Sequence, residues 1–167
     1  MVARRIDPLE PAVVTVGAFH AGDAPNVIPG RAELAGTVRS FDPAVRDRLP
    51  ALIEDVARGV TSAHGVAYEL DYRRGYAPVV NDERATALVR AAIDPEVLAD
   101  LAPIMGGDDF SAYLAKAPGC YAFVGARSEQ AGATYPHHHP RFRIDERALP
   151  VGVRLHVDVA TRALREL

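Results

Sequence analysis

The chain of 167 residues has a single cysteine, no tryptophan, no long apolar run and no surplus of positive charge. Because Cys120 has no second cysteine to pair with, an internal disulfide is excluded and a reducing cytoplasm is favoured. The formal charge of −3 at pH 7 leaves no basic surplus for a phosphate backbone, so we expect no nucleic-acid partner. The apolar runs are short and interrupted, and no apolar signal stretch opens the sequence, so we expect no membrane span and a cytoplasmic location.

What the sequence does contain is the composition of a folded protein, with 49% hydrophobic and 25% charged residues. Three stretches of the first half predict strands. Residues 12–20 are small or β-branched, and residues 31–39 and 66–72 alternate apolar with polar side chains, which predicts that the second strand is half-buried. Strand parity places His20, at the end of the first stretch, on the face of Val14.

A long helix is predicted between the second and third strands. Asp42 and Pro43 are typical of a helix start, and apolar residues then recur at helical spacing up to Val60. Pro50 lies inside this pattern and should kink the helix or delay its start. Strand, strand, helix and strand suit a small antiparallel sheet with a helix on one face.

The second half alternates helices with short apolar segments, which indicates an α/β layer. A Gly- and Pro-containing loop at 74–78 marks the boundary. The elements expected after it are a helix over 82–93, an apolar segment at 101–105, a short helix up to 114, a buried strand over 120–124 and a last helix that begins near 145 or 146.

Two loops carry candidate chemistry. His137, His138 and His139 stand between prolines, and a loop fixed in this way presents an imidazole to a metal, or else is a solvated His-rich loop. Gly106 and Gly107 allow a close backbone approach to a carboxylate or oxyanion through their N–H groups. The alternative for the second loop is that the acidic residues after the glycines cap the next helix.

Three further residues have a functional and a structural interpretation. His20 ends a strand and Asn26 lies in the loop after it, but a histidine in that position is often a satisfied structural residue. Arg39 closes the second strand, where it meets an anionic substrate or lies at a sheet edge. Cys120, inside an apolar stretch, is interpreted as an inert core residue.

Taken together, these residues resemble the zinc-dependent amino-acid amidohydrolases, a family that includes hippurate hydrolase, aminoacylase and the auxin-conjugate hydrolases. The stretches that carry the resemblance, in the family's order and spacing, are 5–17, 20–22, 26–29, 32–39, 76–81, 105–110, 132–136, 138–146 and 149–152. The resemblance implies an α+β unit followed by an α/β unit. Residues 1–75 match a ferredoxin-like lid, or dimerisation, domain, and residues 76–167 match the C-terminal half of a two-metal catalytic domain.

The resemblance also implies roles for single residues. His138 matches a ligand of zinc or manganese in the two-metal site. His20 matches a lid histidine that stabilises the oxyanion in the partner's active site of a homodimer, and Asn26 matches a substrate contact beside it. Gly106 and Gly107 match a loop that lines the substrate pocket.

The implied activity is hydrolysis of the amide bond of N-acyl amino acids or of related small amides and peptides. The family's other metal ligands and its glutamate base have no counterpart in this sequence, so we expect the chain to be a fragment that is inactive by itself. The alternatives are a non-catalytic dimerisation module from a truncated reading frame, and a metal-storage protein that uses its three adjacent histidines.

Overall fold

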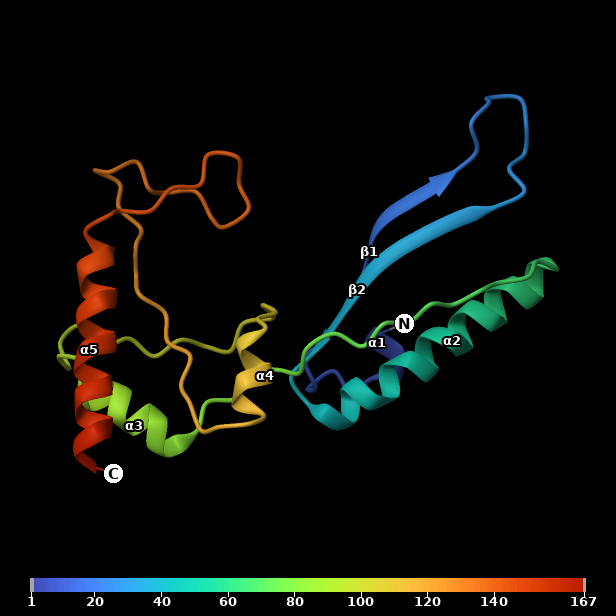
Figure 1. Cartoon of the computed structure of the whole chain (residues 1–167). Helices are drawn as coiled ribbons and strands as arrows, with labels where there is room; N and C mark the ends of the chain where they lie inside the picture. The colour runs from blue at the N-terminus through green and yellow to red at the C-terminus, as the bar shows by residue number, and fades with distance from the viewer. Residues whose placement is uncertain (1, 167) are drawn as a thin grey trace. The chain divides into compact units, whose positions relative to one another are not determined.

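The computed structural model describes residues 2–166 and divides into two compact units. The first unit comprises the residues up to 78 together with 103–111, and the second comprises 79–102 and 112–167. Segment 103–111, which carries the Gly106–Gly107 loop, therefore packs with the first unit although it follows the start of the second in the sequence. Figure 1 shows the elements of both units.

The first unit is built on an antiparallel hairpin of β1 (Ala12–Ala21) and β2 (Ala32–Ser40), which confirms both strand predictions. The partners across the hairpin include Val14 with Val38 and His20 with Glu33. The expectation that the second strand is half-buried is wrong, because only Val38 and Ser40 of β2 are shielded from solvent. The helix covers only the end of the hairpin that leads into it (Figure 1).

A β-bulge in β1 determines the direction in which His20 faces. The pairing register shifts between Val16 and Ala18, so Gly17 is an additional residue without a partner. One extra residue reverses the alternation of side chains beyond it. The predicted face of His20 is therefore wrong, since His20 lies on the face opposite to Val14. Gly36 is required at this place, because a Cβ there would lie 2.2 Å from the Thr15 carbonyl oxygen.

Helix α2 (Pro43–His64) begins at the predicted start signal. The Asp42 carboxylate accepts hydrogen bonds from the backbone N–H groups of Ala44 (2.7 Å) and Val45 (3.0 Å). Gly65 ends the helix in the left-handed conformation at φ 65°. Pro50 does not delay the helix, which runs unbroken from Pro43 through it.

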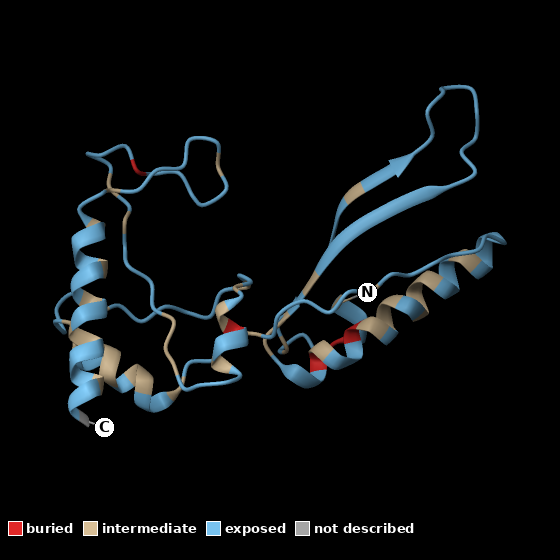
Figure 2. Cartoon of the chain, viewed as in Figure 1, coloured by how far each residue is buried: buried red, intermediate tan, exposed pale blue. Residues whose placement is uncertain are grey.

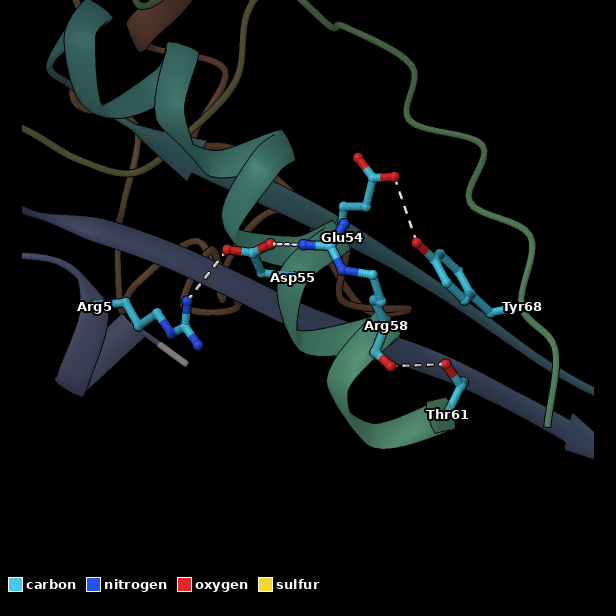
Figure 3. Close-up of polar contacts among 6 residues, drawn as sticks. All are labelled: Arg5, Glu54, Asp55, Arg58, Thr61 and Tyr68. Atoms are coloured by element: carbon cyan, nitrogen blue, oxygen red, sulfur yellow. Dashed lines mark hydrogen bonds and ion pairs between the residues drawn. The ribbon is translucent and has the colours of Figure 1, made fainter. Parts of the chain in front are cut away.

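The core of the first unit is small. Ile6, Val45 and Leu49 are buried, and the side chains packed around them are Val2, Ala12, Val14, Val38 and Leu52. The short helix α1 (Val2–Arg5) contributes to this core and is joined to α2 by an Arg5–Asp55 ion pair at 3.4 Å, drawn in Figure 3. Figure 2 shows how few positions are buried elsewhere: among the described hydrophobic residues, Ala133 of the second unit is the only other one.

The strand predicted over 66–72 does not form. The segment is extended but is not part of a ladder, and Val66 is 57% exposed. It lies along α2, held by the Val66 N–H to the Thr61 carbonyl (3.0 Å) and by the Tyr68 hydroxyl to Glu54 (3.4 Å), as Figure 3 shows for the second pair. A sequence can specify an extended backbone, but a strand also needs a neighbouring strand.

The second unit contains α3 (Glu83–Ala91) and α5 (Ala148–Glu166), which pack together; α4 (Phe110–Leu114) is a single short turn of helix. The prediction of helices in these regions is confirmed. The last helix, α5, begins at Ala148 rather than near 145 or 146. A turn precedes it, in which the Ala148 N–H donates to the Asp145 carbonyl at 2.9 Å. No helix among residues 2–166 has the length and apolar character needed to cross a membrane.

The buried strand predicted over 120–124 is also wrong, since Phe123 is 56% exposed and Cys120 is half-buried rather than a core residue. The segment does have one ladder-like contact. The Asn81 side-chain amide donates to the Tyr121 carbonyl at 3.0 Å and accepts from the Tyr121 N–H at 2.8 Å. A side chain thus occupies the place of a neighbouring strand at one residue.

Replacing Gly36 tests the role of the bulge. We expect Gly36→Ala to lower the urea midpoint of unfolding, because its methyl group collides with backbone rather than with a flexible side chain. The matched control is Gly59→Ala in α2, where a Cβ meets nothing within 4 Å and should stabilise by about 0.5–1 kcal/mol. Equal midpoints for the two variants would contradict the close approach at Gly36.

Candidate functional site

Arg39 and the double-glycine loop come together in the first unit. The Arg39 guanidinium donates to the Met105 carbonyl at 2.6 Å, and a Cβ on Gly107 would lie 3.9 Å from the same Arg39 nitrogen. A guanidinium carries five N–H donors, so this bond leaves others available for an anion. The structure therefore brings Arg39, Gly106 and Gly107 to one place at the end of β2.

The acidic residue after the glycines has a structural role. The Asp108 carboxylate accepts from the Phe110 N–H at 2.8 Å, and the buried Ser111 hydroxyl donates to the Asp108 carbonyl at 3.2 Å. Asp108 thus caps the turn of α4, as the capping alternative predicted. The receiving role of the glycine N–H groups stays a prediction.

His20 and Asn26 lie at the free end of the hairpin. Both side chains are exposed, and His20 faces Glu33 across the strands on the face opposite to the core residue Val14. Glu33 itself pairs with Arg31 at 2.8 Å. His20 is therefore not a core residue of the described structure, and its functional role stays a prediction.

The histidine loop of the second unit is held at both ends by backbone pairing. Ser128 and Ala133 exchange two backbone hydrogen bonds of 3.1 and 2.8 Å, and the Asp145 N–H donates to the Ala126 carbonyl at 2.9 Å. The Arg147 guanidinium donates hydrogen bonds to the Asp145 carboxylate and holds the pKa of that carboxyl well below its usual range. The backbone bond from Asp145 to Ala126 closes the exit of the loop, and the pair with Arg147 holds the Asp145 side chain there.

The three histidines have different environments. The His139 ring stacks on Tyr135 at 4.2 Å, and its Nδ1 accepts from the Arg141 N–H at 3.0 Å. The His137 ring lies edge-on to Phe142 at 4.7 Å. Through these contacts, His137 and His139 stabilise the conformation of the loop.

His138 differs from its neighbours. Its φ of 65° is the only positive value of a non-glycine residue within residues 2–166, whereas its exposure and the absence of a hydrogen bond to its ring nitrogens are shared with His137, whose ring lies 6.4 Å from that of His138. Such a backbone conformation is uncommon for a side-chain-bearing residue and is concentrated at functional sites. The backbone conformation sets His138 apart from its two neighbours, and its role as the residue that reaches a ligand stays a prediction.

The described residues do not by themselves fit a catalytic metal ion. Residues 2–166 contain no group of three or more His, Cys, Asp or Glu side chains placed to hold one. Catalytic zinc sites normally take three protein ligands. His138 is thus one candidate ligand of an incomplete set.

A cavity of about 400 Å³ lies next to the histidine loop, and no sequence pattern predicts it. Its walls include Tyr135, His137 and Phe142, and the only formally charged side chains that line it are Arg127 and Arg143. Its size and lining suit a small anion with an apolar group. Arg127 and Arg143 are far apart in the sequence, so no spacing pattern identifies them as a pair. Both line the cavity because the backbone bond between 126 and 145 closes the loop.

Zinc titration of the isolated chain tests the assignment of the histidines. We expect weak binding, and we expect His138→Ala to lower the affinity by roughly tenfold or more, since losing even an indirect support of a metal ligand costs that much. His139→Ala should leave the zinc affinity nearly unchanged, measured by calorimetry. Tight stoichiometric binding lost only with His139 would show that the wrong histidine has been assigned.

Comparison with known proteins identifies the relatives of the chain. The protein YhaA of Bacillus subtilis, named as an amidohydrolase, is 44% identical over 153 residues, which cover 89% of this chain and 39% of YhaA. The N-acyl-L-amino acid amidohydrolase of Geobacillus stearothermophilus is 48% identical over 81 residues, covering 48% of this chain and 22% of that enzyme. The chain thus spans well under half the length of these relatives.

A solved structure agrees with the sequence relatives. The YxeP protein of Bacillus subtilis, described as a dinuclear metal-binding peptidase of the M20 family, superimposes with a TM-score of 0.75 at 32% identity. The match covers 93% of this chain and 43% of YxeP. The family model for peptidase family M20/M25/M40 matches residues 7–162. The resemblance to the amino-acid amidohydrolases is confirmed, and the chain belongs to peptidase family M20/M25/M40.

Proposed function

We propose that the chain supplies the lid and the C-terminal part of the catalytic domain of an amidohydrolase. Its substrates would be N-acyl amino acids or related small amides and peptides. The relative from Geobacillus stearothermophilus, whose name states that substrate class, supports the first of these. The observation that carries the proposal is the exposed, conformationally unusual His138 in a loop that its two histidine neighbours hold in place.

The proposed roles follow the chemistry of each side chain. His138 ligates zinc or manganese, and His20 donates a hydrogen bond to the oxyanion that develops on the scissile carbonyl. Arg39, Gly106 and Gly107 bind the substrate at the end of β2, and Asn26 contacts the substrate beside His20 at the free end of the hairpin. Since residues 2–166 hold no complete ligand set, catalysis on this proposal needs further ligands and a general base from polypeptide outside them.

The incomplete ligand set also favours a second candidate, a non-catalytic dimerisation module. In that case the first unit mediates self-association and the histidine loop is vestigial. On both proposals the chain works as a homodimer. A cytoplasmic location is proposed on the ground that Cys120 has no disulfide partner.

Amide hydrolysis separates the two candidates. The chain is assayed with an N-acyl amino acid and zinc or manganese, alone and mixed with the part of YhaA outside the match. We expect turnover only in the mixture, and His138→Ala should abolish it. Turnover by the chain alone would refute the incomplete site, and an inactive mixture that forms a stable complex would favour the dimerisation module.

Sedimentation velocity tests self-association. We expect a dimer at high concentration, formed through the β2 region at 31–39 or through α2, because exposed apolar side chains on both gain from burial. Either Leu34→Asp in β2 or Val60→Asp in α2 should weaken the dimer, as these side chains are 62% and 57% exposed. Leu164→Asp in α5 is the control. A strict monomer would count against the proposal.

His20 is tested in an enzyme with a complete site. His20→Ala should leave metal content and dimer intact and lower kcat on the order of 10²–10³-fold, the usual loss for one oxyanion donor. Mixing this variant with His138→Ala should restore part of the activity if His20 serves the partner's site. A lowered melting temperature with unchanged turnover per folded molecule, and no recovery in the mixture, would leave His20 with a structural role only.

A further inference from the structure

Two guanidinium groups share the cavity beside the histidine loop. Arg127 and Arg143 line it, and no acidic side chain of residues 2–166 does. Two like charges that line one cavity repel each other, and a cleft lined by charge of one sign concentrates ions of the opposite sign. The cavity therefore favours a negatively charged ligand.

Both guanidiniums have N–H donors to offer such a ligand. Arg143 forms no hydrogen bond or ion pair with another of the residues 2–166. Arg127 pairs with Glu129 at 3.2 Å, but the two side chains are 73% and 82% exposed, and an ion pair this exposed contributes little to stability. A bound anion can therefore replace Glu129 at small cost. The planar fork of a guanidinium matches the two oxygens of a carboxylate.

Backbone pairing fixes the positions from which the two arginines reach the cavity. Arg127 follows Ala126, whose carbonyl accepts from the Asp145 N–H at 2.9 Å. Arg143 lies two residues before Asp145, so the same closure holds both arginines. A Cβ on Gly132 would lie 3.8 Å from the Arg143 Nη1 atom, which places this guanidinium against the turn at Gly132. The closed loop therefore builds the pair of cations.

The remaining walls of the cavity are largely apolar and incompletely covered. Val124, Phe142 and Ile144 line it, and each is still more than a third exposed. The His137 ring, edge-on to Phe142 at 4.7 Å, lines it as well. Covering apolar surface is favourable, and a volume of about 400 Å³ lies in the range of small-molecule sites. The ligand that fits best thus joins an anion to an apolar group.

We propose that this cavity binds a carboxylate that carries a compact apolar group. The carboxylate accepts hydrogen bonds from Arg127 and Arg143, and the apolar group lies against Val124, Phe142 and Ile144. All of these residues belong to the second unit, and none of them has a role in the proposed hydrolysis. Binding at this site therefore does not depend on the proposed function, and it is measurable without metal or turnover.

Titration of the full chain with benzoate tests the site. We expect benzoate to shift the amide NMR signals of 124–127 and 133–144. The neutral near-isostere benzamide should bind at least tenfold more weakly, because the charge-assisted hydrogen bonds are lost. Inorganic phosphate at equal concentration should not displace benzoate, since it has no apolar group. The proposal is overturned if benzoate does not bind, if it shifts only other residues, or if benzamide or phosphate binds equally well.

The carboxylate comes either from a free acid or from the end of a longer molecule, and a second probe distinguishes these sources. The compound para-acetamidobenzoate has the same charged ring, extended by an amide. Binding at least as tight as that of benzoate assigns the site to the end of a longer molecule. Binding that is tenfold weaker or less assigns it to a free acid.

Arginine variants connect the binding to the two guanidiniums. Arg127→Gln and Arg143→Gln should each weaken benzoate binding roughly tenfold or more. Arg143→Lys should weaken it less, because it keeps the charge and loses only the fork. The matched control is Arg154→Gln in α5, which removes an equal charge from an 85% exposed side chain outside the cavity. It should leave binding unchanged, with the same helix content by circular dichroism in all variants. Equal weakening by the control would reduce the effect to net charge and overturn the site.

Discussion

The packing of the start of α2 on the near end of the hairpin is the contact on which the first unit depends. Val45 and Leu49 are the only buried residues of α2, and with Ile6 they make up the buried hydrophobic core of the first unit among its described residues. Burying such side chains contributes roughly 1.5–3 kcal/mol each, so three of them support only a marginal domain. The Asp42 cap strengthens the same end of the helix by placing a carboxylate at its unpaired N–H groups.

The position of this core decides which candidate residues are rigid. Arg39 stands beside it at the end of β2, where its guanidinium holds the Met105 carbonyl and so orders the double-glycine loop. His20 and Asn26 lie beyond the bulge, on the part of the hairpin that no helix covers (Figure 2). The candidate residues thus comprise one firmly held cation at the covered end of the hairpin and two side chains at its free end.

Local interactions made much of the fold predictable from the sequence. The cap of α2, the hairpin strands and the amphipathic last helix depend on residues near one another in the chain, and all of them form. The face of His20 could not be predicted by counting, because a bulge adds one residue to the alternation. Gly17 and Gly36 were the available signal, since glycine inside a strand often marks a bulge or a close backbone approach.

The segments 66–72 and 120–124, which were predicted as strands but do not form them, depend instead on contacts with distant residues. Their alternation and apolar character are correct for strands, but hydrogen bonds to a neighbouring strand are non-local and must come from elsewhere. Asn81 supplies two such bonds to Tyr121 from a side chain, which holds the extended backbone without making a ladder. The same reasoning applies to the candidate site: the contacts of the histidine loop are local, whereas a full set of metal ligands requires groups that residues 2–166 do not provide. Both the extended segments and the candidate ligand therefore depend on contacts that their own neighbourhoods in the sequence do not supply.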